Sequence, residues 1–427
     1  MNKTLHDKIV TKNIKKPNLM YPILGNVWKL IAHKYNINVK YNINVKYIED
    51  PRKEKGPHIL ISNHASRLDY MFTGIPTLPN RYNFVAGHNE FYRSHLAFVF
   101  NLLNVIPKKN FTADLMTIRQ AMKIVKSGGN ICIFPEGMSS ISGANQPIVN
   151  GTGKFLKLCN VPVYYSVIKG GYLSSPKYNL KDRLGHVEVV FDKLFTKEDL
   201  KELSIEQIED KINEAIYHDD YEWNLKEKHV YKHDGNIAEN LHHLLYWCPK
   251  CGKEFTMTSE KNEIRCSHCG NGATLLDTYE MVPFNEECVI PSTQTKWFNL
   301  QREEVRKQIN NDDFIMQEEV ELGTLPKEKY LKDQKTSNIV GKGIITLTNK
   351  GLTYKGTKDG EEFEFHLDPE EVPTYGMCTD LSRFYTFYKG EFYEFYPKNI
   401  TTEKWFLATE EIHRRQGGKW QDFKFEK

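Results

Sequence analysis

The 427-residue sequence has no run of eighteen or more apolar residues, so we expect no membrane-spanning helix. It also has no polar low-complexity tract. Its 40% hydrophobic and 26% charged residues are typical of globular domains that bury a core. The formal net charge is only +3, so there is no global basic field to attract a nucleic-acid partner. The length predicts two or three domains.

Cysteine is too sparse for a disulfide scaffold, because a chain of this length has only eight, four of them clustered. No secretory signal is visible at the N-terminus, so we expect a reducing, cytosolic compartment. The first twenty residues carry five lysines against one aspartate. This charge favours an anionic membrane surface, and a solvated, frayed terminus explains it equally well. If the protein binds a membrane, we expect it to be peripheral and on the cytoplasmic side.

Short apolar runs alternate with a helical pattern over residues 58–191. The runs predict five strands, at 58–62, 82–86, 130–134, 161–167 and 186–191. Residues 112–127 have apolar side chains at helical spacing, and Gly128-Gly129 supplies the stop. A further helix is expected to begin at Ser204, with Gln207 as its capping-box partner. This order predicts an α/β domain with a parallel or mixed sheet covered by helices.

Four other segments carry weaker signals. Residues 34–47 contain a tandem hexapeptide whose even period predicts a lengthened strand or hairpin. Residues 19–31 predict an interfacial amphipathic helix. Residues 95–106 predict an acyl-binding wall or a membrane-dipping loop, although core packing explains both apolar runs nearly as well. The acidic and polar stretch 217–240 predicts a linker.

The pattern beyond residue 335 is that of β structure. Two turn signals, Asn349-Lys350-Gly351 and Lys389-Gly390, lie between short apolar runs and predict hairpins. A final helix is expected near 402–415. Together they predict a β-rich C-terminal domain, a small barrel or sandwich with a PH-like pattern.

Two CxxC pairs are separated by fourteen residues. Their cysteines are Cys248, Cys251, Cys266 and Cys269. Gly252 and Gly270 follow the pairs and allow the tight turns that direct four thiolates at one ion. The spacing predicts a structural zinc site in a zinc ribbon, with a redox-active dithiol as the alternative and His268 a weaker ligand than Cys269. Charges over residues 248–280 balance, so a scaffold or protein-contact role is favoured over nucleic-acid binding.

A histidine and an aspartate five positions apart follow an apolar strand, in residues 59–70, ILISNHASRLDY. Five residues on an ideal helix do not share a face, so we interpret Ser66 as an N-cap with Asp69 at N3. His64 would then lie in the preceding loop, where Asp69 can hold one ring nitrogen and leave the other free as a base. That base would deprotonate a substrate hydroxyl, which attacks an activated acyl carbon. The alternative is that Asp69 only caps a helix and His64 is a loop residue.

This segment resembles the signature of the glycerolphosphate and lysophospholipid acyltransferase family, which is His, four residues, then Asp. The family's second signature, Phe-Pro-Glu-Gly, stands at residues 134–137, again directly after an apolar strand. Val161-Pro162-Val163 is similar to the family's Val-Pro-Val strand. The two signatures occur in the family's order, and the resemblance covers about residues 55–190.

The resemblance implies an O-acyltransferase of phospholipid synthesis or remodelling. Such an enzyme moves a fatty acyl group from acyl-coenzyme A or acyl carrier protein to a hydroxyl of a lysophospholipid or glycerolphosphate-like acceptor. His64 would be the general base and Asp69 would orient it. The implied substrate-binding residues are Glu136, Gly137, Ser66 and Lys108.

Three positions depart from the family's pattern. Met138-Ser139-Ser140 stands where Thr-Arg-Ser is common, residues 106–109 offer lysine for an arginine, and Gly87 or His88 replaces a lysine. Lysine attracts phosphate as a point charge but lacks the bidentate fork of arginine. These losses weaken the expectation of a phosphate-bearing acceptor and leave the acyl-transfer residues intact.

We therefore expect an acyltransferase domain with an N-terminal amphipathic segment at 1–235, a zinc ribbon at 240–280 and a β-rich domain at 281–427. The expected partners are a lipid acceptor, an acyl donor and a membrane surface, without nucleic acid. The rival class is a catalytically inactive lipid-binding or scaffold protein that uses the ribbon and the β domain. The retained His64 and Asp69 argue against that class, because a decayed enzyme has no reason to keep them.

Overall fold

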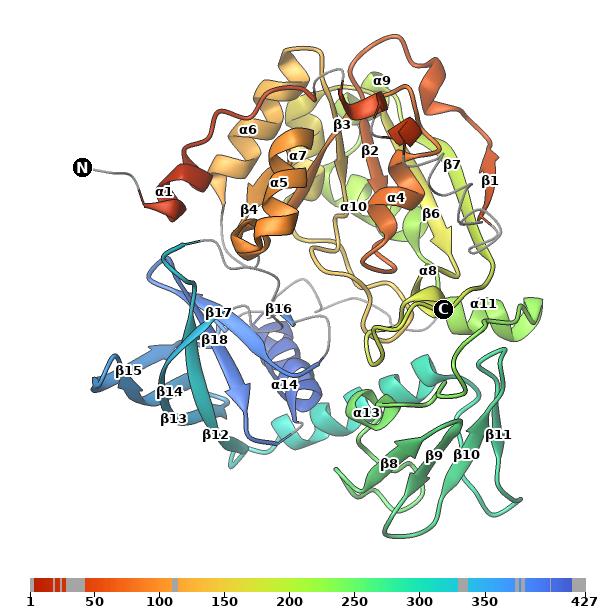
Figure 1. Ribbon diagram of the computed structural model, residues 1–427, viewed down its shortest axis with the longest axis vertical. Coiled ribbons are helices and arrows are strands. Elements are labelled where there is room, and N and C mark those ends of the chain that lie inside the picture. Colours follow the sequence, from red (N-terminus) through yellow and green to blue (C-terminus); the bar gives the residue numbers. More distant parts are fainter. Residues whose placement is uncertain are drawn as a thin grey trace.

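The computed structural model describes most of the chain and contains three β-sheets (Figure 1). The described residues are 4–17, 20–23, 25–27, 43–109, 114–328, 337–372, 376–377, 381–399 and 401–416. No helix within these ranges is both long and apolar enough to cross a membrane.

The first sheet has seven strands in the order β1-β7-β6-β2-β5-β3-β4. Its strands are β1 Ile43–Tyr47, β2 Ile59–Ser62, β3 Tyr82–Gly87, β4 Ile106–Lys108, β5 Asn130–Ile133, β6 Val163–Lys169 and β7 Val187–Phe195. Every neighbouring pair is parallel except β6 with β7, so the sheet is mixed, as predicted. The five predicted strands are present. The sequence reasoning missed β4, because its three residues continue the apolar run 95–106.

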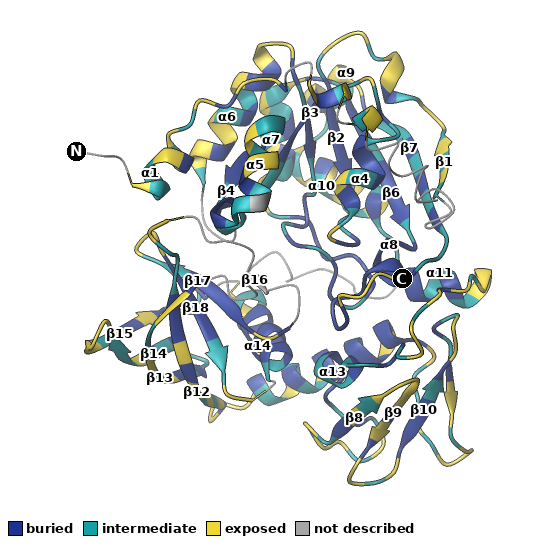
Figure 2. Cartoon of the chain, in the orientation of Figure 1, coloured by how far each residue is buried: buried dark blue, intermediate teal, exposed yellow. Residues whose placement is uncertain are grey.

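Helices cover both faces of this sheet. One face carries α1 Leu5–Val10, α4 Asp69–Gly74, the 3₁₀ helix η2 His88–Tyr92 and α5 Ser94–Leu103. The other carries α6 Leu115–Lys126, α7 Thr152–Cys159, α9 Lys197–Glu202 and α10 Ile205–Ile216. Successive residues of a strand point to opposite faces, so Ile59 and Ile61 pack under the second group of helices and Leu60 under the first. The central strand β2 is accordingly buried at all four of its residues (Figure 2).

Two predicted helices are present. The predicted 112–127 helix is α6, with Asp114 as its N-cap, and α10 has the predicted capping box of Ser204 and Gln207. The predicted linker at 217–240 is wrong, because it contains α11 Asp220–Glu227 and several fully buried side chains. Its polar residues serve as caps and internal hydrogen-bond partners, which hides the apolar pattern.

The N-terminal segments are described only in part. Of the predicted interfacial helix at 19–31, residues 20–23 and 25–27 are helical, and Trp28 lies outside the described residues. Of the hexapeptide repeat at 34–47, only β1 is described. The apolar run 95–106 forms most of α5 and the start of β4.

The remaining chain forms two antiparallel sheets. The smaller has the order β11-β10-β9-β8, with β8 Met257–Glu260, β9 Glu263–Cys266, β10 Gly272–Leu275 and β11 Met281–Pro283. The larger has the order β15-β14-β13-β12-β18-β17-β16. Its strands are β12 Ile315–Thr324, β13 Asn338–Thr348, β14 Gly351–Lys358, β15 Glu361–Leu367, β16 Gly376–Met377, β17 Phe384–Tyr388 and β18 Glu391–Pro397. Both predicted hairpins are present, as β13–β14 and β17–β18.

Five further short or peripheral helices lie between or after the strands. They are η1 Pro51–Lys53, α8 Gly171–Ser174, α12 Leu241–Leu244, α13 Gln294–Ile309 and α14 Thr402–Arg415, the last of these the predicted final helix. One hydrophobic core runs from Leu173 in α8 through Leu275 in the smaller sheet to Trp405 in α14. The Trp297 indole in α13 donates to the Trp247 carbonyl at 2.8 Å, which fixes α13 beside the smaller sheet (Figure 1). The C-terminal half is thus packed together with the first sheet's α8. The exact domain boundaries and the PH-like character stay predictions.

Candidate active site and metal centre

The carboxyl ends of β2 and β5 bring the two sequence motifs together. These strands are parallel neighbours, so the segments that follow them meet at one edge of the sheet. His64 comes two residues after β2, and Phe134 directly follows β5. The two rings stack with centroids 4.6 Å apart. Motifs about seventy residues apart in sequence therefore form one site.

The His64 imidazole is held by a buried carboxylate. His64 Nδ1 lies 2.8 Å from Asp69 Oδ2. Asp69 is 1% exposed, whereas the His64 side chain is 25% exposed, so the ring is accessible and its partner is not. Burial raises the pKa of Asp69, while the hydrogen bonds from His64 and Ser66 act in the opposite direction. Among the described residues, no hydrogen-bond partner occupies His64 Nε2, which is the arrangement of an oriented base.

Ser66 lies behind this pair. It was predicted to be an N-cap, but α4 begins at Asp69 itself, and the Ser66 hydroxyl accepts from the Leu68 N–H at 3.2 Å. The Ser66 N–H lies 3.0 Å from both oxygens of Asp69, so the carboxylate holds the turn that the serine was expected to hold. Ser66 is 3% exposed and its hydroxyl donates to Asp69 Oδ1 at 3.1 Å, and its contact with an acceptor stays a prediction.

Glu136 lies beneath His64. Its side chain is fully buried, and its Oε1 accepts from the His64 N–H at 2.7 Å and from Asn145 Nδ2 at 2.8 Å. Its Oε2 accepts from the Gln146 N–H at 2.8 Å. The predicted substrate-binding carboxylate is therefore bonded to the protein on both oxygens and supports the backbone of His64. The following Gly137 has φ +84°, a backbone conformation that favours glycine.

Lys108 ends β4 at the same edge of the sheet. The strand order puts β5 and β3 between β4 and β2. Three strand spacings separate β4 from β2, a distance of about 14 Å. Burial lowers the pKa of Lys108. The structure thus keeps Lys108 apart from His64, and its predicted contact with a phosphate stays a prediction.

Sequence reasoning missed a second histidine–carboxylate pair beside the first. His218 Nε2 lies 2.8 Å from Asp220 Oδ1, and both residues line a small cavity together with His64. Asn145 connects the pairs, because its Oδ1 accepts from the His218 N–H at 2.7 Å while its amide donates to Glu136. The only sequence signal was the aspartate at 219, typical of a helix N-cap. Nothing in the sequence placed that cap next to His64.

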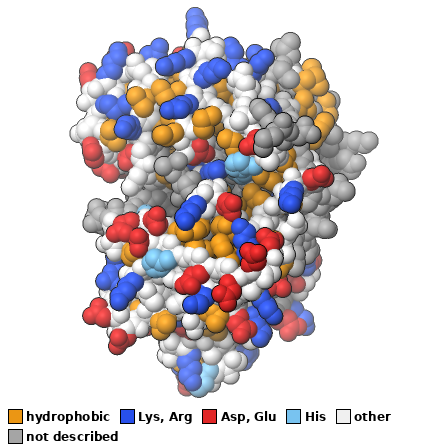
Figure 3. All heavy atoms as spheres, turned by 90° about the vertical axis from the view of Figure 1, so that its left-hand side faces the viewer, with side chains coloured by type: hydrophobic (Ala, Val, Ile, Leu, Met, Phe, Trp, Pro, Cys, Tyr) orange, Lys and Arg blue, Asp and Glu red, His pale blue; other side chains and the backbone are white. Residues whose placement is uncertain are grey.

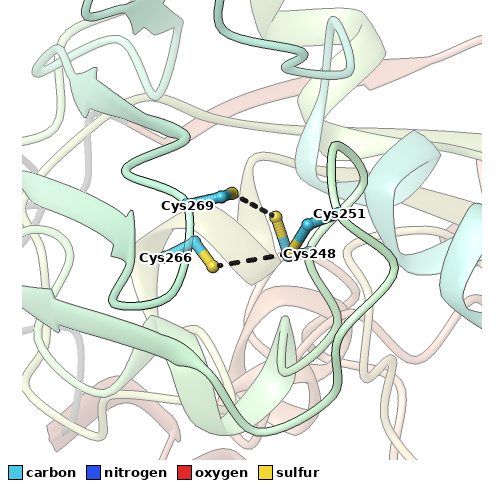
Figure 4. Close-up of side chains that lie close together, drawn as sticks. All are labelled: Cys248, Cys251, Cys266 and Cys269. Atoms are coloured by element: carbon cyan, nitrogen blue, oxygen red, sulfur yellow. Dashed lines mark hydrogen bonds between the residues drawn. The ribbon is translucent and has the colours of Figure 1, made fainter.

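The four clustered cysteines converge on one point (Figure 4). Cys248 and Cys269 Sγ are 3.6 Å apart, Cys251 and Cys266 Sγ are 3.9 Å apart, and all four sulfurs lie within 4.8 Å of one another. Thiolates around tetrahedral Zn²⁺ at about 2.3 Å are separated by about 3.8 Å, so the spacing fits a closed zinc site. His268 is exposed and stands outside this cluster.

Two known protein families match the segments that contain the His64 motif and the cysteine pairs. Residues 42–169 match the family described as Acyltransferase. Residues 242–271 match a zinc-ribbon family described as DNA directed RNA polymerase, 7 kDa subunit. The fold class is therefore confirmed: a mixed α/β acyltransferase-family domain, a zinc ribbon that contains the four-cysteine cluster, and a β-rich C-terminal region.

Similarity to individual proteins covers the same part of the chain. The chloroplastic 1-acyl-sn-glycerol-3-phosphate acyltransferase BAT2 of Brassica napus is 27% identical over 116 residues. The match covers 27% of this chain and 33% of that protein, so the chain spans about a third of its relative's length. The crystal structure of the 1-acyl-sn-glycerophosphate acyltransferase PlsC from Thermotoga maritima has a TM-score of 0.35 at 20% identity, over 41% of this chain and 70% of that chain. The family match and the Brassica relative confirm the resemblance to 1-acylglycerol-3-phosphate O-acyltransferases seen in the sequence motifs.

Proposed function

We propose that this protein is an O-acyltransferase that esterifies a hydroxyl of a lysophospholipid or glycerolphosphate-like acceptor. The observation that carries this proposal is the exposed His64 imidazole, held 2.8 Å from the buried Asp69 carboxylate. The acyltransferase family match and the named substrate of the Brassica relative support this acceptor class. The donor is a fatty acyl thioester of coenzyme A or acyl carrier protein.

The proposed reaction needs one base and no covalent enzyme intermediate. His64 Nε2 takes the proton of the acceptor hydroxyl, and the oxygen attacks the thioester carbonyl carbon. The tetrahedral intermediate collapses with cleavage of the C–S bond, and the imidazolium returns the proton to the leaving thiolate. Asp69 fixes the tautomer and stabilises the positive charge on the ring while His64 holds the proton. Glu136 holds the His64 backbone in place for both proton transfers.

A large cavity supports a long acyl substrate. It has a volume of ≈ 520 Å³ and lies between α1, α5 and β4. Its lining includes the apolar side chains of Leu5, Ile9 and Phe91, together with Lys8 and Lys12. Apolar walls beside cationic groups suit a fatty chain attached to an anionic head. We propose that this cavity receives the acyl chain.

The surface near this cavity supports peripheral membrane binding. Phe98 on α5 is 71% exposed and Leu115 on α6 is 62% exposed. On the face in Figure 3, which is the side of α1, α5 and α6, Lys and Arg gather on the upper half with hydrophobic side chains between them. Exposed apolar residues among cations suit an anionic bilayer surface. We propose peripheral association with the cytoplasmic side of such a bilayer.

A mass-spectrometric product assay tests the proposed activity. Purified wild-type and His64→Ala proteins are given a panel of lysophospholipids with acyl-coenzyme A or acyl carrier protein donors. We expect acylated product from the wild type and at least a 1,000-fold lower rate from the folded variant, since removal of a catalytic base costs several powers of ten. An equally active variant would remove the dyad from the mechanism.

The same assay also tests the proposed acyl-chain cavity and the alternative that the protein has no transferase activity. Ala97→Trp, which adds volume in the large cavity, is expected to shorten the longest acyl chain accepted. An unchanged chain-length profile would put the acyl group elsewhere. No product from any donor and acceptor pair, with folded protein, would favour the lipid-binding or scaffold class.

A further inference from the structure

The short helix α8 lies directly against the dyad turn. A Cβ added to Gly171 would be 3.0 Å from Ala65 Cβ and 3.8 Å from Asp69 Oδ1. The preceding strand is tied to the same turn, because Asn63 donates to the Ile168 carbonyl at 2.8 Å and accepts from the Ile168 N–H at 2.7 Å. The space around the Asp69 carboxylate therefore depends on where α8 lies.

Groups from later in the chain hold both ends of α8. The Asp220 carboxylate accepts from the N–H groups of Gly170 and Tyr172, each at 2.7 Å. At the other end, the Tyr279 hydroxyl donates to the Leu173 carbonyl at 2.5 Å. The position of α8 is thus fixed by side chains that lie outside the matched acyltransferase segment.

Tyr279 lies in the turn between β10 and β11 of the smaller sheet, the sheet that continues from the zinc-ribbon match at residues 242–271. The side chain is 3% exposed, and its hydroxyl accepts from Arg183 Nη1 at 2.5 Å. Arg183 is 1% exposed and donates through its own N–H to the Ser174 carbonyl at 2.9 Å, again at the end of α8. Tyr279 and Arg183 therefore form a buried, charge-assisted hydrogen-bond network that connects the smaller sheet to the end of α8.

Strand β10 connects the metal site to the turn that carries Tyr279. Cys266 ends β9, and Cys269 comes three residues before β10, whose far end leads into the turn with Tyr279. The Cys266 N–H donates to the Asn271 carbonyl at 2.8 Å across this connection. Because binding of structural zinc is coupled to folding of such a module, the metal fixes the start of β10, the strand that leads to Tyr279.

We infer that Tyr279 is a positioning residue for acyl transfer and that the metal-loaded ribbon is a structural part of the active site. This inference rests on the proposed acyltransferase function. Loss of the metal frees the β9–β10 hairpin and removes the Tyr279 hydroxyl from the Leu173 carbonyl. The helix α8 then loosens, and Asp69 no longer holds His64 in one orientation.

Tyr279→Phe and Tyr246→Phe form a matched pair that tests this inference. Tyr246 is 2% exposed in the same core, and its hydroxyl has no hydrogen-bond partner among the described residues. Both full-length proteins are first shown by elemental analysis to carry one zinc per chain. For Tyr279→Phe we expect about a 10-fold lower kcat, a KM within twofold of wild type and a displaced inflection in the pH profile of kcat/KM. Loss of folded protein alone would lower the profile without moving its inflection.

Amide hydrogen exchange gives a readout that needs no activity. In Tyr279→Phe, residues 170–175 and 63–69 are expected to exchange at least 10-fold faster than in wild type. Tyr246→Phe should match wild type in both segments and in kcat. Wild-type protein stripped of zinc by a chelator should show the same faster exchange in residues 170–175.

Two results would overturn the inference. One is a zinc-stripped protein whose residues 170–175 exchange as slowly as before. The other is a Tyr279→Phe protein that equals Tyr246→Phe in exchange and in pH profile. If wild type transfers no acyl group, the proposed function fails, and the exchange measurements still decide whether the ribbon holds α8.

Discussion

The buried Glu136 carboxylate gives the most direct test of how the site is built, through the isosteric substitution Glu136→Gln. Its hydrogen bonds fall on both oxygens, from His64 and Asn145 on Oε1 and from Gln146 on Oε2. An amide has only one oxygen. Whichever way the glutamine turns, its NH₂ group faces at least one N–H donor and leaves it unpaired.

The size of the effect follows from burial and charge. Glu136 is fully buried, and a hydrogen bond to a charged group contributes about 1.5–3 kcal/mol. If the NH₂ group faces Gln146, one such bond is lost and an N–H is left buried, so we expect a loss of about 2–4 kcal/mol in the free energy of unfolding. If it faces His64, the backbone of the proposed base shifts. Each 1.4 kcal/mol lost from the transition state lowers kcat about 10-fold, so kcat should fall about 10- to 100-fold.

Glu209→Gln is the matched control. Glu209 also accepts two backbone N–H groups, from Gly151 at 3.0 Å and Gly153 at 2.9 Å. Both bonds fall on the same oxygen, Oε1, so a glutamine can keep them. Chemical denaturation and acyl transfer by both variants should separate the two sites, with Glu209→Gln within about 1 kcal/mol of wild type and fully active. A Glu136→Gln protein as stable and active as this control would refute the supporting role of Glu136.

Two other properties can be tested by substitution. Phe98→Glu should weaken binding to phosphatidylglycerol vesicles about 10-fold or more, because an exposed phenyl ring contributes about 2 kcal/mol when buried in lipid. Val282→Glu, at an exposed site on β11, should bind vesicles like wild type. Equal binding by all three proteins would contradict the proposed membrane-binding surface. Burial, with His6 and Lys109 nearby, lowers the pKa of His88 to about 4. The pKa of His88 in the folded protein thus lies below its unfolded value of 6.5. Its contribution to the free energy of unfolding, about 3 kcal/mol, is therefore fully present above pH 6.5 and is lost as the pH falls toward 4. Denaturation midpoints at pH 7.5 and 4.5 should therefore differ less for His88→Asn than for wild type, and equal differences would show that His88 does not titrate as stated.

Local signals in the sequence predicted much of the fold. The five apolar runs became strands, apolar spacing predicted α6, and the capping box of Ser204 and Gln207 predicted the start of α10, because these signals depend on neighbouring residues. The stretch 217–240 was misassigned as a linker for the opposite reason. Its polar residues are used inside the protein, and only their tertiary partners reveal this.

The sequence by itself predicted which residues form the two candidate sites. The spacing of His64 and Asp69 and the two CxxC pairs identified the residues that meet, because each set closes over a short loop. Only the tertiary structure decided which polar residues are buried and hydrogen-bonded around His64. Ser66 and Glu136 proved to be buried supports, and Asp220 and Tyr279 reach the same region from beyond the matched domain. Such contacts depend on strand order and on the docking of the ribbon, and neither of these is encoded in a local pattern of residues.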